Sequence, residues 1–400
     1  MYNAHKLFYQ PAPQPCLRTS LILNDGQREK LERARKLVRA ALRAGLAKAS
    51  EYAPGGEYYS EGYLARAKFA DRKDTSLSPR FRTQGSWAYD TLNQPAQAGQ
   101  QIDLDEGMYL PMSILEGAHP AVASTVLYAI VETILGALCE AEGWTLDTSK
   151  NICVRLVIDE EAHIDVNIYA VPDAKVALLE RAMAKSMVAA DSATYDQATY
   201  FLRLDPDEVY VAHRKKGWEQ SDPLQLEDWF LDAIKRHKSW TDLRRIVRYL
   251  KAWRDQRWDA CRLSSLALMV CAVEALDEAN TPPLPNRDDD GLLVVARALA
   301  GKLALPVYNP VVGTSMLNGE WGTDERNQFE LGARLLASEM EAAIKSETTA
   351  GGVVQRLRKL FGPRMPNDIT LVSATATIQQ IRSTAPARAP SPKVGTSTSG

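Results

Sequence analysis

Two segments of this chain alternate between apolar and polar residues in the way that β-strands do. Residues 101–110 and 163–169 place every second side chain on the same face, because successive side chains of a strand point to opposite sides. A shorter run over 153–158 is joined to 163–169 by an acidic turn, which predicts two adjacent strands. Another strand is predicted from Phe81 onward. We therefore expect a β-sheet in the first half of the chain.

Apolar residues at helical spacing predict helices elsewhere. A long helix is predicted over 27–50, with Asn24 or Asp25 as its cap. The apolar run 121–139 is interpreted as a buried core helix and not as a membrane span, because Glu132 lies in its middle and the run is barely long enough to cross a bilayer. After Pro223 the pattern predicts helices over 224–238, 242–256, 264–280, 291–303, 324–345 and 351–361.

This order of elements predicts an α+β protein with two lobes and a tail. Residues 1–220 are expected to form a sheet-containing lobe with its long N-terminal helix, and residues 221–383 a helical lobe. Residues 384–400 consist almost entirely of Ala, Pro, Ser, Thr and Gly, so they cannot bury a core and are predicted to be disordered. Residues 51–79 are predicted to be a loop with some helix.

Charge and cysteine content narrow the classes of function. The 400 residues include 48 basic and 50 acidic side chains, for a formal charge of -2, which excludes a general nucleic-acid coat. The five cysteines form no CxxC pair, which argues against a disulfide framework or a zinc ribbon. The N-terminus lacks the apolar segment of a secretory signal. We therefore expect a cytoplasmic protein with neither a membrane nor stably bound nucleic acid as a partner.

Three carboxylates mark the predicted centre of the chemistry. Asp103 and Asp105 share one face of the 101–110 strand, and Asp165 joins them if the 163–169 strand pairs alongside. Clustered carboxylates repel one another unless a cation neutralises them, and carboxylate oxygens suit Mg²⁺. Two such ions would clamp the attacking and leaving oxygens of an in-line phosphoryl displacement. Gly85-Ser86 ahead of the strand would allow phosphate oxygens to approach the backbone and the hydroxyl.

With these residues the sequence resembles the nucleotidyltransferase superfamily of the DNA polymerase beta type. The fuller string PRFRTQGSWAYDTLNQPAQAGQQIDLDEGMYLPM (79–112) resembles the cGAS/DncV-like nucleotidyltransferases, within them the bacterial branch that makes cyclic GMP-AMP. Segments 163–172, 221–230 and 251–269 fit the same branch in the same order. The resemblance covers residues 5 to about 375 and implies a polymerase-beta-type core with a helical second lobe and the active site in the cleft between them.

The resemblance also implies roles for individual residues. Two Mg²⁺ ions, with Mn²⁺ as a substitute, would be held by Asp103, Asp105 and Asp165, and Asp165 would help to activate the attacking hydroxyl. The expected nucleotide-binding residues are Gln84, Gly85, Ser86, Tyr89, Arg155, Ser221, Asp222, Lys251, Ser264 and Ser265. Of these, Lys251 and Ser265 would hold donor phosphates, Arg155 and Asp222 would contact the acceptor nucleotide, and Tyr89 would stack near a base.

Several remaining charged and aromatic residues are interpreted from the local pattern alone. Residues 240–262 contain seven basic and three acidic side chains, and Arg244, Arg248, Lys251 and Asp255 are predicted to line one polar face. The acidic run 288–290 is interpreted as a loop leading into a helix N-terminus, where acids are favourable. His163 is interpreted as a core or supporting residue. Packing roles are predicted for Trp218, Trp229, Trp253 and Trp258.

Two sites of regulation are implied by the resemblance. Arg35, Arg39, Arg43 and Arg80 match the basic residues of a folate-like inhibitor pocket on the face opposite catalysis, although Arg82 replaces the aromatic residue that would stack on the ligand. The last residue, Gly400, matches a C-terminus that a ubiquitin-like ligation system of E1/E2 type joins to other proteins.

The expected activity is the Mg²⁺-dependent joining of ATP and GTP into a 3′,3′-linked cyclic dinucleotide, cyclic GMP-AMP. This product would activate a downstream effector in antiphage (CBASS) signalling. Three alternatives remain open: a cyclase that makes cyclic di-AMP or a trinucleotide, a template-independent nucleotidyltransferase acting on RNA or a small molecule, and a non-catalytic nucleotide-binding protein. The intact carboxylates argue against the last, and base choice rests on a few pocket contacts.

Overall fold

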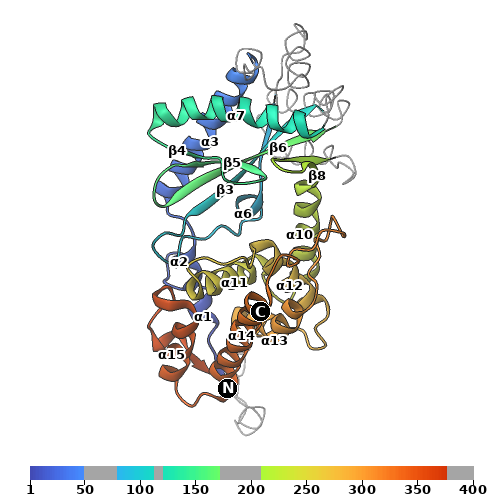
Figure 1. Cartoon of the computed structure of the whole chain (residues 1–400). Helices are drawn as coiled ribbons and strands as arrows, with labels where there is room; N and C mark the ends of the chain where they lie inside the picture. The colour runs from blue at the N-terminus through green and yellow to red at the C-terminus, as the bar shows by residue number, and fades with distance from the viewer. Residues whose placement is uncertain (49–78, 112–119, 172–208, 376–400) are drawn as a thin grey trace, which may run out of the picture.

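The computed structural model describes residues 1–48, 79–111, 120–171 and 209–375. These residues form two lobes, with a mixed sheet and its covering helices in one and a bundle of helices in the other (Figure 1). The α+β class and the helical second lobe predicted from the sequence are thus confirmed. The predicted tail and most of 51–79 lie outside the described residues.

The sheet has its two longest strands in parallel at its centre. Its path runs β2-β3-β6-β5-β4, with β7 pairing to β6 and β8 to β7. Only β3 and β6 are parallel to each other among these described strands. The bounds are β2 Arg80–Thr83, β3 Ile102–Pro111, β4 Thr145–Asp147, β5 Cys153–Val157, β6 Ala162–Val171, β7 Tyr210–His213 and β8 Gly217–Gln220.

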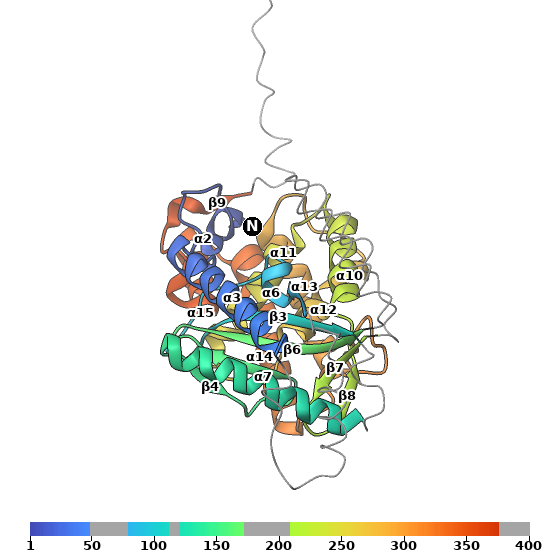
Figure 2. The same cartoon turned by 90° about the horizontal axis from the view of Figure 1, so that it is seen from above.

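Two long helices cover one face of the sheet, side by side when seen from above (Figure 2). Helix α3 (Asp25–Leu46) begins at Asp25 and not at the predicted residue 27, because Asn24 and Gln27 form a capping box. Helix α7 (Pro120–Glu142) contains one stretch, Ser124–Glu142, that is long and apolar enough to span a membrane. The apolar side chains of both helices pack with those of β3 and β6 in one core, as predicted for the apolar run.

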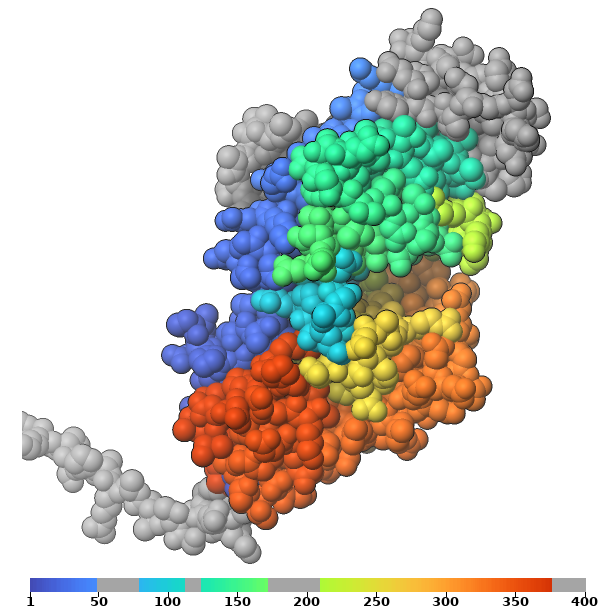
Figure 3. Space-filling model, turned by 60° about the vertical axis from the view of Figure 1, so that its left-hand side comes forward, coloured from blue at the N-terminus to red at the C-terminus, as the bar shows by residue number. Residues whose placement is uncertain are grey.

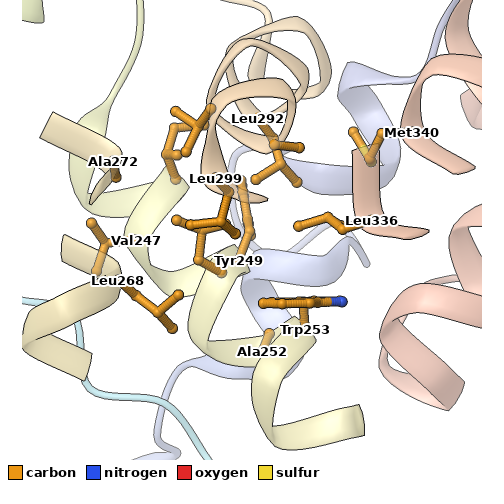
Figure 4. Packing of buried hydrophobic residues seen from close by; sticks show 14 of the residues in the cluster. Val247, Tyr249, Ala252, Trp253, Leu268, Ala272, Leu292, Leu299, Leu336 and Met340 are labelled. Atoms are coloured by element: carbon orange, nitrogen blue, oxygen red, sulfur yellow. The ribbon is translucent and has the colours of Figure 1, made fainter. Parts of the chain in front are cut away.

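The helical lobe follows the predicted order of helices, with boundaries shifted by a few residues. Its end carries one π-helical turn, Ala342–Ser346, after α14. The helices are α10 Pro223–His237, α11 Leu243–Arg257, α12 Ser265–Asp277, α13 Asp288–Ala304, α14 Thr323–Glu341 and α15 Ala350–Phe361. Trp253 and Tyr249 lie at the centre of the core, packed among leucines of α13 and α14 (Figure 4). Trp253 is therefore a packing residue, as predicted.

The N-terminal segment belongs to the helical lobe. Helices α1 (His5–Phe8) and α2 (Leu17–Leu21) place Leu7, Phe8 and Leu17 in the same core as Trp253, and strand β1 (Tyr2–Asn3) pairs with β9 (Ser373–Ala374). The chain therefore starts in the helical lobe and reaches the sheet lobe through α3. The sequence-based boundary at residue 220 missed this crossing, because sequence order does not reveal which lobe an apolar segment joins.

The acidic run 288–290 is the first turn of α13 and not a loop before it. Asp288 is fully buried and accepts two hydrogen bonds from the Arg245 guanidinium, at 2.7 and 2.9 Å, and one from the Tyr249 hydroxyl at 2.7 Å. Asp289 accepts a hydrogen bond from the Ala4 backbone N–H. Buried charges need such partners, so the run joins the N-terminal segment and α11 to α13.

The two lobes meet where α11 packs against the segment between α6 (Gly85–Ala88) and β3. Arg248, 5% exposed, donates hydrogen bonds to the carbonyl oxygens of Asp90 and Leu92, and Asn93 donates to the Arg248 carbonyl oxygen. Gln100 donates to carbonyl oxygens at the C-terminal end of α11. This segment, cyan in Figure 3, lies between the sheet lobe and the helical lobe.

Candidate active site

The parallel pairing of β3 and β6 brings the predicted carboxylates together. Asp105 is the register partner of Asp165, and Asp103 is the partner of His163. Strand alternation sends Leu104 into the core beneath α3 and α7, so these four side chains share the opposite face of the sheet. The predicted arrangement of the three aspartates on adjacent strands is confirmed.

A short turn holds Gly85 against Asp105. Gly85 has φ +58°, a conformation that other residues adopt rarely, and a Cβ atom there would lie 2.0 Å from Asp105 Oδ2. Ser86 follows at the start of α6. Only glycine fits at position 85. Because the turn lies so close to Asp105, the following residue, Ser86, lies near the carboxylates.

Hydrogen bonds of Gln84 hold the same turn in place. Its backbone N–H donates to the Asp105 carbonyl oxygen at 2.9 Å. Its side-chain amide donates to the Tyr109 hydroxyl at 2.6 Å and accepts from the Tyr169 hydroxyl at 3.1 Å. The two tyrosine rings stack at 5.0 Å between centroids. Gln84 is therefore placed to position the turn, a function for which the sequence offered no signal beyond its location.

The pKa values of Asp105 and Asp103 are shifted in opposite directions. Burial, together with the nearby Asp103 and Asp165 carboxylates, raises the pKa of Asp105 well above its usual range. Burial would also raise the pKa of Asp103, but His163 and Arg155 outweigh it and lower that pKa. The Asp103 side chain is 48% accessible because it faces a cavity. The site thus carries carboxylates that repel one another around a solvent-accessible point.

This arrangement fits a divalent cation. Ligand atoms of Asp103, His163 and Asp165 lie within 4.8 Å of one another, and His163 Nε2 is 3.0 Å from Asp103 Oδ1. Burial and the two neighbouring carboxylates raise the pKa of Asp105, and a bound cation would oppose that shift. Oxygen-rich clusters of this kind bind hard cations. His163 lies closer to the centre than the sequence indicated, since strand register alone decides that it faces Asp103.

Arg155 pairs with Asp165 across the sheet. Its Nε and Nη2 atoms each donate to one Asp165 carboxylate oxygen at 2.7 Å, a two-point ion pair. The two residues are direct partners in the antiparallel register of β5 and β6. The guanidinium also lines the cavity beside Asp103.

A cavity of about 400 Å³ lies between Asp103 and the helical lobe, and Asp105 and Asp165 are not among the residues that line it. Lys251 lies in its wall and donates hydrogen bonds to the Ser86 hydroxyl and the Thr91 carbonyl oxygen, each at 2.8 Å. Burial, with Arg254 nearby, lowers the pKa of Lys251 to about 7. The turn at Ser86 and the helical lobe therefore meet at one buried amine.

The N-terminus of α12 forms another wall of the cavity. Ser264 caps this helix by accepting from the Ala267 N–H, and Ser265 follows at its first position. Arg254 donates to the Ser265 hydroxyl at 3.1 Å and to the Leu263 carbonyl oxygen. A helix N-terminus with serine hydroxyls, a lysine and an arginine is suited to phosphate. Arg254 follows Lys251 by three residues, a helical spacing that could have indicated it.

Comparison with known proteins identifies the family. The chain matches the description "Cyclic GMP-AMP synthase DncV-like, nucleotidyltransferase domain" over residues 79–169 and "Cyclic GMP-AMP synthase, C-terminal domain" over 241–374. A cyclic GMP-AMP synthase of Vibrio cholerae is 35% identical over 327 residues, which cover 75% of this chain and 71% of that protein. The chain belongs to the DncV-like family of cyclic GMP-AMP synthases. It is accordingly a nucleotidyltransferase.

Solved structures of the family agree with the fold. Vibrio cholerae DncV in complex with the linear intermediate 5′ pppA(3′,5′)pG has a TM-score of 0.74 and 26% identity, covering 94% of this chain and 99% of that one. A variant of the same enzyme in complex with ATP, GTP and 5MTHFGLU2 has a TM-score of 0.76 at 26% identity, with the same coverage. The resemblance inferred from the sequence is thus confirmed.

Three residues expected to contact nucleotide in a DncV-like enzyme have other partners in this structure. Tyr89 is 7% exposed and packs edge-on against Phe230, with 5.7 Å between ring centroids. Asp222 is 4% exposed and caps α10 by accepting from the backbone N–H groups of Leu224 and Gln225. Ser221 precedes it, and its backbone N–H donates to the Val209 carbonyl oxygen at 3.0 Å. Their contacts with nucleotide stay predictions.

The polar residues of α11 fall into two groups with different partners. Arg244 and Arg248 do not line the cavity but donate to backbone carbonyl oxygens of residues 89–92. Lys251 and Asp255 line the cavity, together with Arg254. Of the four residues predicted to share one polar face, Lys251 and Asp255 therefore face the cavity, whereas Arg244 and Arg248 bond to the backbone of residues 89–92. Residues 89–94 pack against α11, and this packing decides which arginines bond to backbone carbonyl oxygens and which reach the cavity.

The four arginines of the expected inhibitor pocket lie between α3 and β2, and several already have partners. Arg39 Nε donates to the fully buried Glu106 carboxylate at 2.7 Å, and Arg35 donates to the Thr83 hydroxyl at 3.0 Å. Burial, with Arg39 and Arg80 nearby, lowers the pKa of Arg43. Part of the positive charge at this face is thus neutralised within the protein.

Proposed function

We propose that this protein makes 3′,3′-cyclic GMP-AMP from ATP and GTP in a Mg²⁺-dependent reaction. The observations that carry the proposal are that Asp105 and Asp165 lie in register on adjacent strands, that Gly85 packs against Asp105, and that Asp103, Ser86 and Lys251 line one cavity. Cyclic dinucleotide synthesis itself follows from the family, whose members are named cyclic GMP-AMP synthases.

Different residues would bind the donor triphosphate and the acceptor nucleotide. Ser86, Lys251 and Ser265, with Ser264 and Arg254, would hold the donor triphosphate, because they offer hydroxyls, cations and a helix N-terminus. Gly85 would allow close approach of that triphosphate to the backbone. Arg155, Ser221, Asp222 and Tyr89 would contact the acceptor nucleotide and its base.

The reaction is two successive nucleotidyl transfers. The 3′-hydroxyl of one nucleotide attacks the α-phosphorus of the other, a P–O bond forms, and pyrophosphate leaves with the electrons of the broken bond. Asp165 would help to accept the hydroxyl proton. The linear product then turns over, and the second transfer closes the ring and releases a second pyrophosphate. Mg²⁺ ions held by Asp103, Asp105 and Asp165 would neutralise charge that develops on the phosphate oxygens.

Product identification tests this proposal. The protein is incubated with each labelled ribonucleotide, singly and in pairs, with Mg²⁺ or with Mn²⁺ as the substitute, and the nuclease-resistant products are identified by mass spectrometry. Cyclic GMP-AMP is the expected product of ATP with GTP, and Asp103→Asn with Asp105→Asn should abolish it. A linear polymer, or no cyclic product, would contradict the proposal.

The alternatives differ in the same experiment. A cyclic di-AMP or trinucleotide product would keep the cyclase and correct the bases. Extension of an added RNA would indicate a template-independent transferase. The formal charge of -2 disfavours the RNA activity, because single-strand binders use basic grooves.

We further propose that the protein acts in antiphage signalling, with a cyclic-dinucleotide effector downstream and a ubiquitin-like ligation system of E1/E2 type acting on Gly400. Residues 1–220, 221–383 and 384–400 would then be catalytic lobe, helical lobe and conjugated tail, with residues 1–21 packed on the helical lobe. Removal of Gly400 should leave synthesis unchanged and prevent conjugation to partner proteins in cells that contain the ligation system.

The arginine face is proposed as a regulatory anion site. The site would consist of Arg35, Arg39, Arg43 and Arg80. The guanidinium groups of Arg39 and Arg43 lie 5.9 and 5.0 Å from the centre of the Phe81 ring, and that of Arg35 lies 5.5 Å from the Trp87 ring. A folate-like polyanion should inhibit synthesis, and Arg43→Ala should relieve that inhibition. Because Glu106 already neutralises Arg39 and Arg82 is paired with Glu227, we expect weak binding. Unchanged synthesis at millimolar ligand would contradict a site here.

A further inference from the structure

The Arg155–Asp165 ion pair occupies both oxygens that a metal would use. Asp165 Oδ1 and Oδ2 each accept a hydrogen bond of 2.7 Å from the same guanidinium. The pair is well shielded, with side-chain exposures of 20% for Arg155 and 11% for Asp165. A fork of this kind is among the strongest interactions available to a carboxylate, because two parallel charge-assisted bonds form at once.

The neighbouring carboxylates show why such a partner is needed. Asp165 is the register partner of Asp105, and ligand atoms of Asp103 and Asp165 lie within 4.8 Å of each other. Like charges at this spacing oppose folding when nothing compensates them. Arg155 stands opposite Asp165 in the β5–β6 register and reaches across to it, so the sheet itself supplies a positive charge to the cluster.

We propose that Arg155 is a built-in counter-ion that holds Asp165 until a divalent cation displaces it. The inference rests on the metal site of the proposed function. Cation binding and the Arg155 fork compete for the same two oxygens, so the ion must break or share the fork to engage Asp165. The released guanidinium then remains in the cavity wall, where an acceptor nucleotide would meet it. Arg155 would act as a positioning residue that couples loading of the metal to binding of the second nucleotide.

Mn²⁺ binding in the absence of nucleotide tests this competition directly. Free Mn²⁺ is followed by electron paramagnetic resonance during titration of the wild type, Arg155→Met and Arg155→Lys. Arg155→Met should bind Mn²⁺ roughly tenfold more tightly than the wild type, which corresponds to about 1.4 kcal/mol. Arg155→Lys should lie between them, since an ammonium cannot form the two-point fork. An Arg155→Met protein that binds Mn²⁺ no more tightly than the wild type overturns the proposal.

Arg254→Gln is the matched control for general charge. Arg254 lines the same cavity, but its guanidinium bonds to Asp255, Ser265 and a carbonyl oxygen and touches none of the three carboxylates. Its removal should change Mn²⁺ affinity by less than about twofold, because a screened charge acts weakly at a distance. A gain equal to that of Arg155→Met would mean that net charge, and not displacement, sets the affinity, and would overturn the proposal.

Thermal unfolding gives a second readout that is independent of synthesis. In EDTA, Arg155→Met should melt below the wild type because Asp165 loses its partner beside like charges. Added Mn²⁺ should raise the melting temperature of Arg155→Met more than that of the wild type, and Asp165→Asn in the same background should abolish the extra rise. Equal shifts in both proteins would contradict the proposal. Loss of synthesis in Asp103→Asn with Asp105→Asn is a separate result that concerns only the proposed function.

Discussion

Lys251 of α11 donates a hydrogen bond to the hydroxyl of Ser86 at 2.8 Å, and so joins the helical lobe to the turn that precedes the carboxylate strand. The same amine bonds to the Thr91 carbonyl oxygen, and its side chain is shielded from solvent. This buried amine lies in the wall of the cavity beside Asp103, so its protonation affects the contact between the two lobes.

The buried amine predicts a pH dependence of stability. The pKa of Lys251 is lowered from 10.5 to about 7, so between those values the folded protein binds fewer protons than the unfolded chain. The free energy of unfolding therefore rises with pH across this window, by at most about 1.4 kcal/mol per pH unit. Urea unfolding at pH 7, 8 and 9 should show this slope in the wild type but not in Lys251→Met. Lys359→Met, which removes an exposed lysine, should keep the slope.

Gly85→Ala should destabilise the protein and stop synthesis. The new methyl group would meet Asp105 Oδ2 at 2.0 Å, in addition to the strain of a positive φ. Gly99→Ala is the matched control, because Gly99 has φ +87° and open space around it. Strain alone should cost about 1–2 kcal/mol in the control. Gly85→Ala should cost more and lower product formation by about 100-fold, since it displaces Asp105, a carboxylate that we propose to bind metal.

Asp105→Asn should stabilise the metal-free protein at neutral pH. The raised pKa of Asp105 means that the folded protein retains a proton which the unfolded chain loses above about pH 4. The free energy of unfolding in EDTA therefore falls as pH rises from there, and the amide, which does not ionise, removes that loss. Chemical unfolding in EDTA measures the difference, and Mg²⁺ should shrink it. Glu160→Gln, at an exposed turn, should leave stability unchanged; an equally stable Asp105→Asn protein would contradict the prediction.

Asp288→Asn should be strongly destabilising although it lies outside the active site. The change removes the fully buried carboxylate from Arg245 and Tyr249 and leaves Arg245 with the more exposed Asp242 as its ion-pair partner, at a cost of up to about 3–5 kcal/mol. Glu341→Gln is the control, because its ion pair with Arg297 is about half exposed on both sides and contributes less than about 1 kcal/mol. Thermal and urea unfolding measure both. Similar small losses in the two variants would contradict a structural role for the acidic run.

Much of the fold could be predicted because its signals are local. The alternation of 163–169 places Asp165 on one face, and the apolar residues between its polar positions pack beneath α3 and α7. The helices after Pro223 were found for the same reason, since each carries its own apolar stripe. The boundary between lobes could not be found in this way, because Leu7 and Phe8 join a core formed by residues far along the chain.

The sequence by itself determined the strand pattern, the glycine at position 85 and the set of three aspartates, since each depends on spacing or on the identity of one residue. Tertiary structure alone decided which charges face the cavity. Arg248 and Lys251 are neighbours on one helical face, yet the first holds the Asp90 and Leu92 carbonyl oxygens and the second lines the cavity. Arg155 opposes Asp165 only through the β5–β6 register. Charged side chains take the partners that packing brings near them, and packing joins segments that the local sequence cannot connect.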